Sequence, residues 1–492
     1  MSTHKLVAWI TFLAVFAMAA RVSVDTDTWW HLRAGEWMLE NGRILNVDQF
    51  SYTRSGEPWN YPGWLVEVPM YLIYRSLGPG GLNLWTASMV TLAFTFIWNT
   101  LSGGPFLRAF VVILAATVSG VYWAARPYLV TFTFTAITVW ILEQQRPSEE
   151  SPGKRFRRPA WWWLPFIMIV WVNSHGGFIA GFIIWGVYWL ADSYALLRKV
   201  RQSGRPIMNS RIWETPLTLA GIGMLAAVSI NPAGPAMLTY PLKTVGIGVL
   251  QEYIQEWQSP DFHSLSVQPF AWMLLLVIAA IGFSRRRLAF TDFALVSGFA
   301  YLGLLAGRNI ALFALVAPMA ITRHLEPLLA ALRRRLVIRS APPRPPKGFF
   351  RYLNAAILLV VLLAVGAKIA LVYPESANES VFADTLPTRA VKYLISSEPP
   401  GRMFNSYNWG GYLIWALRDY PVFADGRTDL NDDEILEQWL TVARGEDGWQ
   451  SVLENWGVRL VFIERDLPVA SKLAAEGWQE VYRDDLAVVF RR

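Results

Sequence analysis

The chain has 492 residues, of which 54% are hydrophobic and only 16% are charged. Soluble domains usually carry about 25% charged residues, so the composition excludes an ordinary water-soluble protein and indicates one embedded in a membrane. The net charge of +7 divides into two parts, because residues 374–492 hold 12 Lys and Arg against 20 Asp and Glu, whereas residues 1–373 hold 32 against 17. The absence of cysteine excludes disulfides and thiolate metal sites.

Residues 1–373 contain a series of apolar stretches long enough to cross a bilayer with some tilt. The first could also be a cleaved signal peptide, because residues 17–20 read Ala-Met-Ala-Ala, but a first span agrees better with the spans that follow. Segment 64–75 is apolar but short and contains Glu67 and Pro69, so we interpret it as an amphipathic helix on the outer surface. We predict about eleven transmembrane helices: 6–20, 82–101, 106–124, 128–145, 160–173, 176–197, 214–231, 267–283, 288–305, 307–322 and 352–373.

The segments between these spans differ in charge. The positive-inside rule places basic linkers in the cytoplasm, so we predict a cytoplasmic N-terminus, a first outer loop of residues 21–81 and an extracytoplasmic segment 374–492, in a cell inner (plasma) membrane. Because the basic residues lie between apolar runs, they indicate contact with the lipid bilayer and no binding of nucleic acid. The basic linkers are 146–158, 198–211, 285–287 and the proline-containing 323–351.

The first outer loop opens with two carboxylates, Asp25 and Asp27, just beyond the first span. Residues i and i+2 of an extended segment point the same way, so the pair could hold a divalent cation, Mg²⁺ or Mn²⁺, or take a proton from an acceptor. Acids in an outer loop can also be merely solvated. A functional site is favoured because further polar residues fall on the same predicted side of the membrane: His31, Arg126, Asn173, His175, Asn231, Arg308 and Asn309.

Each of these residues alone has a structural explanation, because Arg at a span end can snorkel, Asn-Pro often stops a helix and a lone His is usually structural. Their gathering on one face favours a site, since polar groups at membrane depth are costly. Arg binds phosphate through two hydrogen bonds and His adds a donor, which leaves the carboxylates for a second substrate or a metal. A donor phosphate in the bilayer and an acceptor hydroxyl outside it are the substrates of a lipid-linked sugar transferase.

Residues 374–492 alternate helical and strand-like patterns, which predicts a small α/β domain separate from the membrane domain of residues 1–373. Within it we note an apolar segment at 412–417 and a polar turn at 425–427. The expected regular elements are a strand-like segment 421–424, a helix 432–443, a strand 458–463, a helix 469–477 and a hairpin of 478–482 with 486–490.

Three motifs resemble those of the GT-C superfamily of integral membrane glycosyltransferases, specifically the bacterial relatives of protein O-mannosyltransferases and lipid A aminoarabinose transferases. They are Asp25-Thr26-Asp27 followed by Trp29-Trp30-His31-Leu32, the turn Asn173-Ser174-His175-Gly176 and the turn Arg308-Asn309. The likeness covers about residues 5–373. It implies inverting transfer of a sugar from a polyprenyl-phosphate donor to an extracytoplasmic acceptor, which is a glycan, a lipid or a protein.

The resemblance also implies roles for individual residues. Asp25 or Asp27 would be the general base or the acid that organises a metal, and the donor phosphate would bind Arg126, His175, Arg308 and Asn309. The chain departs from the family in having Asp-Thr-Asp where mannosyltransferases have Asp-Glu, and in having no acid at the Arg126 turn.

Two glycine-containing polar segments, 405–411 and 424–429, are similar to segments of the periplasmic domains of bacterial members of this superfamily. Turn chemistry explains them equally well, because Asn, Asp and Gly tolerate unusual backbone angles. The functional interpretation adds Asn405, Asp425 and Arg427 to His31, Asn173 and Asn231 as residues that contact a substrate.

Two other functions use the same residues. A transporter or flippase of a lipid-linked sugar would also bind phosphate through Arg, and a non-catalytic member would keep only the fold. A transporter should show paired inverted repeats and ionisable groups near the middle of its spans. No such repeats are evident, and Glu143, Asp192 and Asp292 lie near predicted cytoplasmic ends, where snorkelling would explain them.

Overall fold

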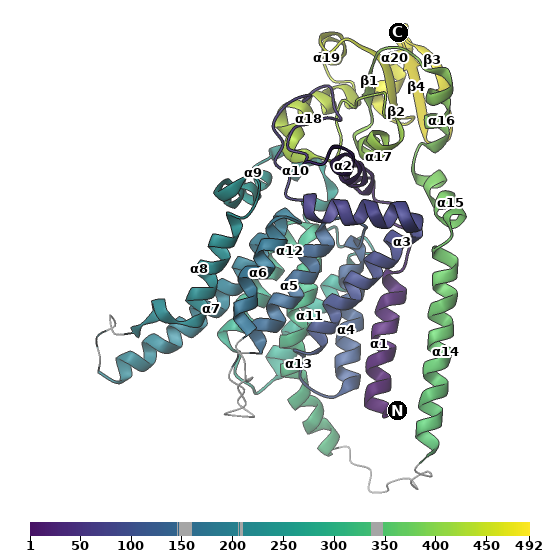
Figure 1. Cartoon of the computed structure of the whole chain (residues 1–492). Helices are drawn as coiled ribbons and strands as arrows, with labels where there is room; N and C mark the ends of the chain where they lie inside the picture. Colours follow the sequence, from purple (N-terminus) through teal and green to yellow (C-terminus); the bar gives the residue numbers. More distant parts are fainter. Residues whose placement is uncertain (145, 147–159, 205, 207–209, 336–347) are drawn as a thin grey trace.

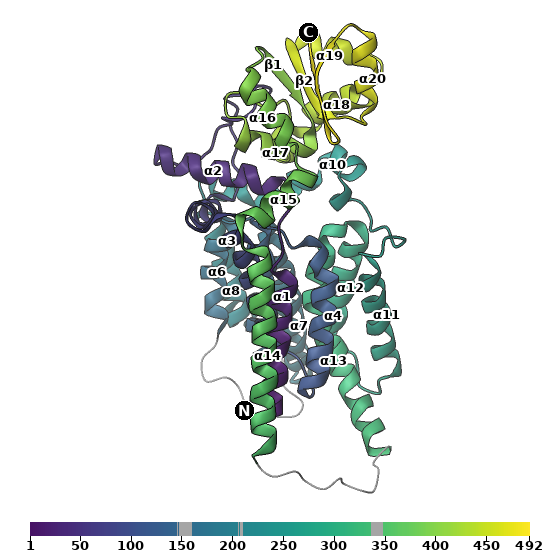
Figure 2. The ribbon, with the colours of Figure 1, turned by 90° about the vertical axis from the view of Figure 1, so that its right-hand side faces the viewer.

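The computed structural model describes residues 1–144, 146, 160–204, 206, 210–335 and 348–492, without the side chains of 250–252. Helices form a bundle that carries a separate layer of helices and strands at one end (Figure 1). The N-terminus lies at the opposite end of the bundle from this layer, which contains the C-terminus (Figure 2). We call the end below the C-terminal layer the capped end. The basic linker residues 147–158 and 336–347 lie outside the described residues.

Each predicted span corresponds to one apolar helix of the bundle. Five helical stretches are long and apolar enough to cross a membrane, and six shorter apolar helices accompany them among the described residues. The chain is thus a multi-pass membrane protein, while the number of crossings stays a prediction. The bundle helices are α1 (Thr3–Ala19), α3 (Trp64–Trp98), α4 (Pro105–Ser119), α5 (Tyr128–Glu143), α6 (Trp163–Val172), α7 (Ile179–Gln202), α8 (Pro216–Val228), α11 (Gln268–Phe283), α12 (Phe290–Leu305), α13 (Ile310–Arg335) and α14 (Phe349–Val372).

The position of a helix in the bundle follows from how much of its surface is apolar and covered. Helix α13 is buried on all sides from Ile310 to His324, so it forms the centre of the bundle. Helix α14 is the most apolar of the five long helices, yet only 11% of its apolar window is covered by protein. A helix that is apolar all round and uncovered is suited to face lipid tails. Accordingly α14 stands at the edge of the bundle, beside α1 (Figure 2).

Helix α3 changes direction at Gly78, whose φ of 63° and ψ of −166° are not helical. Only glycine adopts such a conformation without steric cost, and Pro79 follows it directly. The first part of α3 lies across the capped end of the bundle, and the second part descends into it (Figure 1). This arrangement agrees with the interpretation of segment 64–75 as a helix on the surface followed by a span.

The C-terminal layer is an α/β body built around a four-stranded sheet with strand order β1-β2-β4-β3. Strands β1 and β2 pair in parallel, whereas β4 is antiparallel to both β2 and β3. Its elements are α15 (Glu375–Thr385), α16 (Thr388–Ser397), β1 (Arg402–Asn405), α17 (Tyr407–Ala416), α18 (Thr428–Arg444), α19 (Trp449–Asn455), β2 (Val458–Glu464), α20 (Pro468–Ala475), β3 (Gln479–Arg483) and β4 (Ala487–Arg491).

Most elements predicted for this body are present. The strand at 458–463, the helices at 432–443 and 469–477 and the terminal hairpin correspond to β2, α18, α20 and β3–β4. The segment 421–424 was predicted to be strand-like, but it forms no strand of the sheet, and its Val422 makes only an isolated bridge to Ser51 of the first outer loop. Strand β1 was not predicted.

The C-terminal body shares its hydrophobic core with the first outer loop. That loop contains α2 (Asp27–Asn41), whose Trp30, Ala34 and Met38 pack into one buried cluster with C-terminal side chains such as Leu413 and Phe462. Helix α2 lies directly beneath α17 (Figure 1). The first outer loop thus completes one hydrophobic cluster of the body and is fixed between the body and the bundle, whereas the buried residues of a second cluster all come from residues 374–492.

A buried ionic network joins α5, α12 and α13 at the end of the bundle opposite the body. Asp292 lies 2.8 Å from Arg146, and Arg323 contacts both Asp292 and Glu143. The carboxylate side chains of Glu143 and Asp292 are only 7% and 4% exposed. Snorkelling was therefore the wrong explanation for these two acids, which are paired inside the protein, whereas Asp192 is exposed.

Candidate functional site

A cavity of about 990 Å³ lies at the capped end, between the helix ends and the C-terminal body. Small-molecule sites are commonly clefts of 300–1,000 Å³. Its walls come from the starts of α2 and α5, the turns before α7 and α13, the segment 253–258 and the body segments 407–408 and 426–429. Seven of the twelve predicted site residues line it: Asp25, Asp27, His31, Arg126, His175, Arg308 and Asn309.

The two aspartates reach the cavity because of how α1 and α2 are joined. Helix α1 ends at Ala19, and Asp27 is the first residue of α2. The Asp27 backbone N–H donates to Asp25 Oδ1 at 2.9 Å, a local turn that starts the helix. Carboxylates at a helix N-terminus are stabilised by its unpaired N–H groups and dipole. The Asp-x-Asp pattern therefore presents both side chains to the same cavity.

Arg126 stands between the two aspartates. Its Nη1 lies 2.9 Å from Asp25 Oδ2, and its Nη2 lies 3.1 Å from Asp27 Oδ2. The guanidinium group was predicted to bind a donor phosphate, but here its charge is directed to the carboxylates. These side chains are 19–22% exposed, so the cluster opens onto the cavity.

Sequence reasoning missed Glu256, which connects the two arginines of the cavity. It lies in the short helix Gln255–Trp257, 3.5 Å from Arg126 Nη1 and 3.4 Å from Arg308 Nη1. Burial alone would raise the pKa of this carboxyl group, but Arg126 and Arg308 outweigh it and hold the pKa below its usual value. No motif marks Glu256 in the sequence, and only the fold brings it opposite the arginines.

Arg308 is the more available of the two cavity arginines. Its Nη1 lies 3.4 Å from Glu256 Oε1. Its guanidinium lies over the ring of Trp257, 4.4 Å from the ring centroid. Stacking leaves the edge of a guanidinium free to bind oxygen atoms. The neighbouring Asn309 donates its side-chain amide to the carbonyl of Leu302 at 3.1 Å and so closes the end of α12.

Asp27 is the carboxyl group of the cavity most suited to proton transfer. Burial raises its pKa to about 7, an effect that the opposite charge of Arg126 partly offsets. A general base works best when its pKa lies near the working pH. Asp27 can therefore accept a proton near neutral pH, which an ordinary exposed carboxylate does poorly.

His175 presents a hydrogen-bond donor to the cavity. Its Nδ1 accepts the backbone N–H of Gly177 at 2.9 Å and lies 2.9 Å from the hydroxyl of Thr131. Burial lowers the pKa of this imidazole to about 3, so the ring is neutral. With Nδ1 accepting, the single proton is on Nε2, where it can donate to an anion.

His31 is buried at the inner wall of the cavity. Its Nδ1 lies 2.8 Å from Glu67 Oε1 on α3, and burial lowers the pKa of its imidazole well below the usual value. The contact joins α2 to the surface part of α3. His31 is thus engaged with the protein rather than free for a substrate.

Asn173 and Asn231 do not line the cavity. Asn173 donates to the carbonyl of Ile230 at 2.7 Å and accepts the indole N–H of Trp64 at 2.9 Å, and Asn231 donates to the carbonyl of Val172 at 2.9 Å. These bonds satisfy backbone groups at the capped ends of α6 and α8 and fasten them to α3. The predicted substrate contact is replaced by a structural role.

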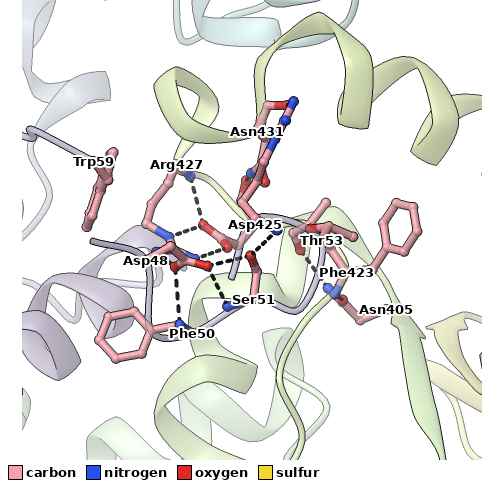
Figure 3. A network of polar contacts seen from close by, with 12 residues as sticks. Asp48, Phe50, Ser51, Thr53, Trp59, Asn405, Phe423, Asp425, Arg427 and Asn431 are labelled. Carbon is pink, nitrogen blue, oxygen red and sulfur yellow. Dashed lines mark hydrogen bonds and ion pairs between the residues drawn. The ribbon is translucent and has the colours of Figure 1, made fainter. Parts of the chain in front are cut away.

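Arg427 and Asp425 also lie outside the cavity lining, in a closed network shown in Figure 3. Arg427 binds Asp425 through Nε and Nη2, both at 2.8 Å, and contacts Asp48 of the first outer loop. Its guanidinium lies over the rings of Phe50 and Trp59, at 5.3 and 5.0 Å from their centroids. All three charged side chains are fully buried, so they fasten the body to the loop rather than bind a substrate.

Asn405, the third predicted residue of the body, is part of the same junction. Its amide donates to the carbonyl of Ala424 at 2.8 Å and accepts the backbone N–H of Phe423 at 2.6 Å. Asn405 therefore connects the end of β1 to the segment that leads to Asp425 (Figure 3). This closed pairing also explains why 421–424 does not extend the sheet.

Gly426 is the point at which this junction contacts Asp27, the candidate catalytic residue. A Cβ atom added at Gly426 would lie 1.9 Å from Asp27 Oδ1, so the backbone of the body touches the carboxylate directly. Only glycine permits this approach. The C-terminal body is thus one wall around Asp27, and the neighbouring Arg427 fixes that wall in place.

The donor set around Asp25 and Asp27 fits a divalent cation poorly. Both carboxylates already bind Arg126, and no cluster of three or more Asp, Glu, His or Cys side chains within the described ranges has the arrangement of a metal site. A hard cation such as Mg²⁺ requires several oxygen ligands, so it would have to displace the guanidinium.

Comparison with known proteins identifies the fold. No protein-family model and no curated protein matches the sequence. A structure of the archaeal oligosaccharyltransferase AglB from Archaeoglobus fulgidus, in complex with an inhibitory peptide and a dolichol-phosphate, matches with a TM-score of 0.56 and 12% identity over 94% of this chain and 70% of that one. The same enzyme tethered to an acceptor peptide gives a TM-score of 0.55 and 13% identity over 94% and 69%.

ArnT from Cupriavidus metallidurans bound to undecaprenyl phosphate aligns over 100% of this chain and 98% of its own length, with 14% identity. Its TM-score of 0.48 is below the level that supports a common fold. The AglB matches exceed that level, and AglB is a membrane glycosyltransferase of the GT-C superfamily. Identity this low establishes a fold and not an activity. The chain is therefore a multi-pass membrane protein that has the GT-C fold, as the sequence resemblance implied.

Proposed function

We propose that the protein is a membrane glycosyltransferase that moves a sugar from a polyprenyl-phosphate donor to an acceptor on the capped side of the membrane. The observation that carries this proposal is the single cavity into which Asp27, Arg126, His175 and Arg308 converge at the end of the apolar bundle. A carboxyl group suited to accept a proton and cationic or N–H donors suited to bind phosphate stand in one pocket. These are the two kinds of group that the transfer requires.

In the proposed reaction an acceptor hydroxyl attacks the anomeric carbon of the donor sugar. The bond between that carbon and the phosphate oxygen breaks, polyprenyl phosphate leaves, and the hydroxyl proton passes to Asp27. Attack opposite the leaving group inverts the anomeric configuration. The charge that develops on the phosphate is stabilised by Arg308 and by the Nε2–H of His175. Arg126 holds the carboxylates of Asp25 and Asp27 in position. No step requires a divalent cation.

The apolar side of the cavity suits a lipid donor. Ile179 and Ile183 of α7, Phe299 and Leu302 of α12 and Leu312 of α13 line the cavity toward the bundle. A polyprenyl chain is apolar along its length, so it can lie against these helices while its phosphate meets Arg308 and His175. A water-soluble nucleotide sugar would not need this wall.

Topology follows from the charge of the linkers. We place the basic ends of the bundle in the cytoplasm, and the capped end with residues 374–492 outside it, in the inner (plasma) membrane. Arg333, Arg334 and Arg335 close α13 at the end opposite the body, which supports this orientation (Figure 1). The acceptor is then a glycan, a lipid or a protein of the cell envelope.

The test compares cells that carry the wild-type chain, Asp27→Asn or Asp485→Asn at equal membrane abundance. Asp485 is an exposed residue of the body and serves as the matched control. Mass spectrometry of envelope glycans, glycolipids and glycoproteins should show a glycosylated species that is lost in Asp27→Asn and kept in Asp485→Asn. Identical profiles in all strains would refute a transferase. Translocation of a lipid-linked sugar by Asp27→Asn without product formation in the wild type would support the transporter alternative.

A further inference from the structure

One wall of the cavity takes no part in the chemistry described above. It is formed by Trp30 and Tyr61 of the first outer loop, Tyr240 of α9 (Tyr240–Val245) and Asp429 of α18. The Trp30 and Tyr61 rings lie 5.2 Å apart in an edge-to-face contact, and the Tyr240 hydroxyl bonds Asp429. We call these four residues the aromatic wall. It faces the same space as Asp27 and Arg126.

Asp429 is held in this wall by neutral donors. Its Oδ2 accepts the indole N–H of Trp59 at 3.0 Å and the hydroxyl of Tyr240 at 3.1 Å. Among the described residues no Lys, Arg or His approaches it within salt-bridge distance, since the neighbouring Arg427 is engaged by Asp48 and Asp425. Burial raises the pKa of its carboxyl group. Asp429 is half-buried at the cavity, and a carboxyl group partly removed from water without a cationic partner is costly to keep, which points to a role in binding.

A purely structural explanation for Asp429 is its place in the first turn of α18, where an acid favours the helix dipole. That role needs no partners beyond the backbone of α18. Instead, Trp59 and Tyr240 from two other segments fix the carboxyl group against the cavity. Their two bonds both end on Oδ2. A role at the start of the helix would not require these two bonds, which hold the Asp429 carboxyl group at the cavity.

Trp30 supplies an independent observation. It is only 3% exposed, and its indole N–H approaches the Asp27 carboxylate without forming a hydrogen bond of ordinary geometry with any described residue, although Trp30 belongs to the cavity lining. A buried unsatisfied donor at a cavity is costly and indicates a missing acceptor. An acceptor such as a ligand hydroxyl would satisfy it. The wall therefore combines an open N–H donor, a carboxylate acceptor and two tyrosine rings.

We propose that Asp429, Trp30, Tyr61 and Tyr240 form a subsite for a sugar ring, in which Asp429 binds ring hydroxyls and the aromatic rings pack against the C–H face. A carboxylate oxygen accepts strong hydrogen bonds from hydroxyl groups, and the indole N–H donates to another oxygen of the same ring. This inference rests on the proposed transferase function. The sugar belongs either to the lipid-linked donor or to the acceptor, because both meet at Asp27.

Two binding measurements on the full chain in nanodiscs separate these sources. The first compares undecaprenyl phosphate with undecaprenyl-phosphate-linked glucose, galactose, mannose and arabinose. The second measures binding of the corresponding free methyl glycosides. If the subsite holds the donor sugar, at least one lipid-linked sugar binds at least tenfold more tightly than undecaprenyl phosphate. If the subsite holds an acceptor sugar, a methyl glycoside binds, and the lipid-linked sugars bind no more tightly than undecaprenyl phosphate.

Asp429→Asn should reduce the sugar-dependent gain to less than threefold and leave the dissociation constant of undecaprenyl phosphate unchanged. That unchanged value also shows that the variant is folded. Tyr240→Phe keeps the ring but removes the hydroxyl that orients Asp429, so it should cause a partial loss. Asp485→Asn is the control and should behave as wild type.

The inference is overturned if the wild type shows no sugar-dependent binding in either measurement, or if Asp429→Asn retains it in full. Failure of the proposed function gives a different result. In that case undecaprenyl phosphate itself does not bind, whatever the methyl glycosides do. A sugar preference that depends on Asp429 without any phosphate-dependent binding would keep the subsite and reject the lipid-linked donor.

Discussion

Two arginines of this molecule each bind two aspartates, and their surroundings give them different roles. Arg126 lies between Asp25 and Asp27 with a side chain that is 21% exposed at the cavity. Arg427 lies between Asp48 and Asp425 with a side chain that is fully buried. The same trio of charges faces an open cavity in one place and fastens two segments together in the other.

The difference lies in what surrounds the charges. Phe50 and Trp59 cover the faces of Arg427, and backbone N–H groups of Phe50 and Ser51 complete the shell of Asp48. Nothing remains for a ligand to bind. The Arg126 cluster includes a third acid, Glu256, and opens onto 990 Å³ of cavity, so a ligand can exchange with these partners. Access to the cavity, rather than residue type, separates the candidate site around Arg126 from the structural cluster around Arg427.

The largest effect is expected at the open cluster. Asp27→Asn removes the proton acceptor, so kcat should fall by about 10²–10⁴-fold, a typical contribution of general base catalysis, while polyprenyl phosphate binding persists. Because the ionised form of Asp27 is the base and its pKa is about 7, wild-type kcat should rise as pH increases through about 7 and then level off. Steady-state rates between pH 5 and 9 check both points. A full rate at pH 5 would contradict the role of Asp27.

The closed cluster should respond in stability. Arg427→Met leaves two buried carboxylates without a partner, and breaking such a buried pair costs about 3–5 kcal/mol. Arg126→Met should cost less than about 2 kcal/mol, because water in the cavity can solvate the carboxylates that it exposes. Thermal or denaturant unfolding of the purified full chain measures both variants. Equal losses would mean that both clusters are structural and would remove the contrast between them.

A smaller effect is expected where the two clusters meet. Gly426→Ala places a methyl group against Asp27 Oδ1 and should displace that carboxylate from Arg126. We expect kcat to fall about tenfold, since displacement of a reacting group by about 1 Å can cost up to about 10²-fold, with little change in the KM of the lipid donor. Gly104→Ala is the matched control, because an added Cβ there meets no atom within 4 Å. An unchanged kcat in Gly426→Ala would show that the body does not position Asp27.

The smallest effect is expected from removing divalent cations. Since Arg126 occupies both carboxylates, activity of the purified chain after chelation should change less than about twofold, and added Mg²⁺ or Mn²⁺ should not raise it. Rates measured with and without chelator test this. A strict requirement for either cation would mean that Arg126 leaves Asp25 and Asp27 in the working enzyme.

Local patterns predicted the parts of the molecule whose environment is uniform. Apolar runs predicted the positions of the bundle helices, and the alternation around 478–490 predicted the hairpin of β3 and β4. The Asp-x-Asp motif and the cavity arginines were also identified, because these polar residues gather on one predicted side of the membrane. Segment 421–424 was misjudged, since its partner is Ser51, a residue about 370 positions earlier in the chain.

The remaining site residues depended on contacts between distant segments. Asn173, Asn231, Asn405, Asp425 and Arg427 have the polarity of ligand contacts, but each is paired within the protein. Glu256 carries no local signal, and Asp429 was marked only as part of the polar segment 424–429; they reach the cavity through the segment 253–258 and the docking of the body.

The sequence by itself determined that apolar segments cross the membrane and that an acidic body follows them, because hydropathy and charge act locally. Only the tertiary structure decided which charged residues face an open cavity and which are sealed. That outcome depends on partners far apart in the chain, such as Asp48 with Arg427 and Glu256 with Arg126. A charged side chain keeps the same identity in both settings, while its desolvation and its access to a ligand are set by what packs around it.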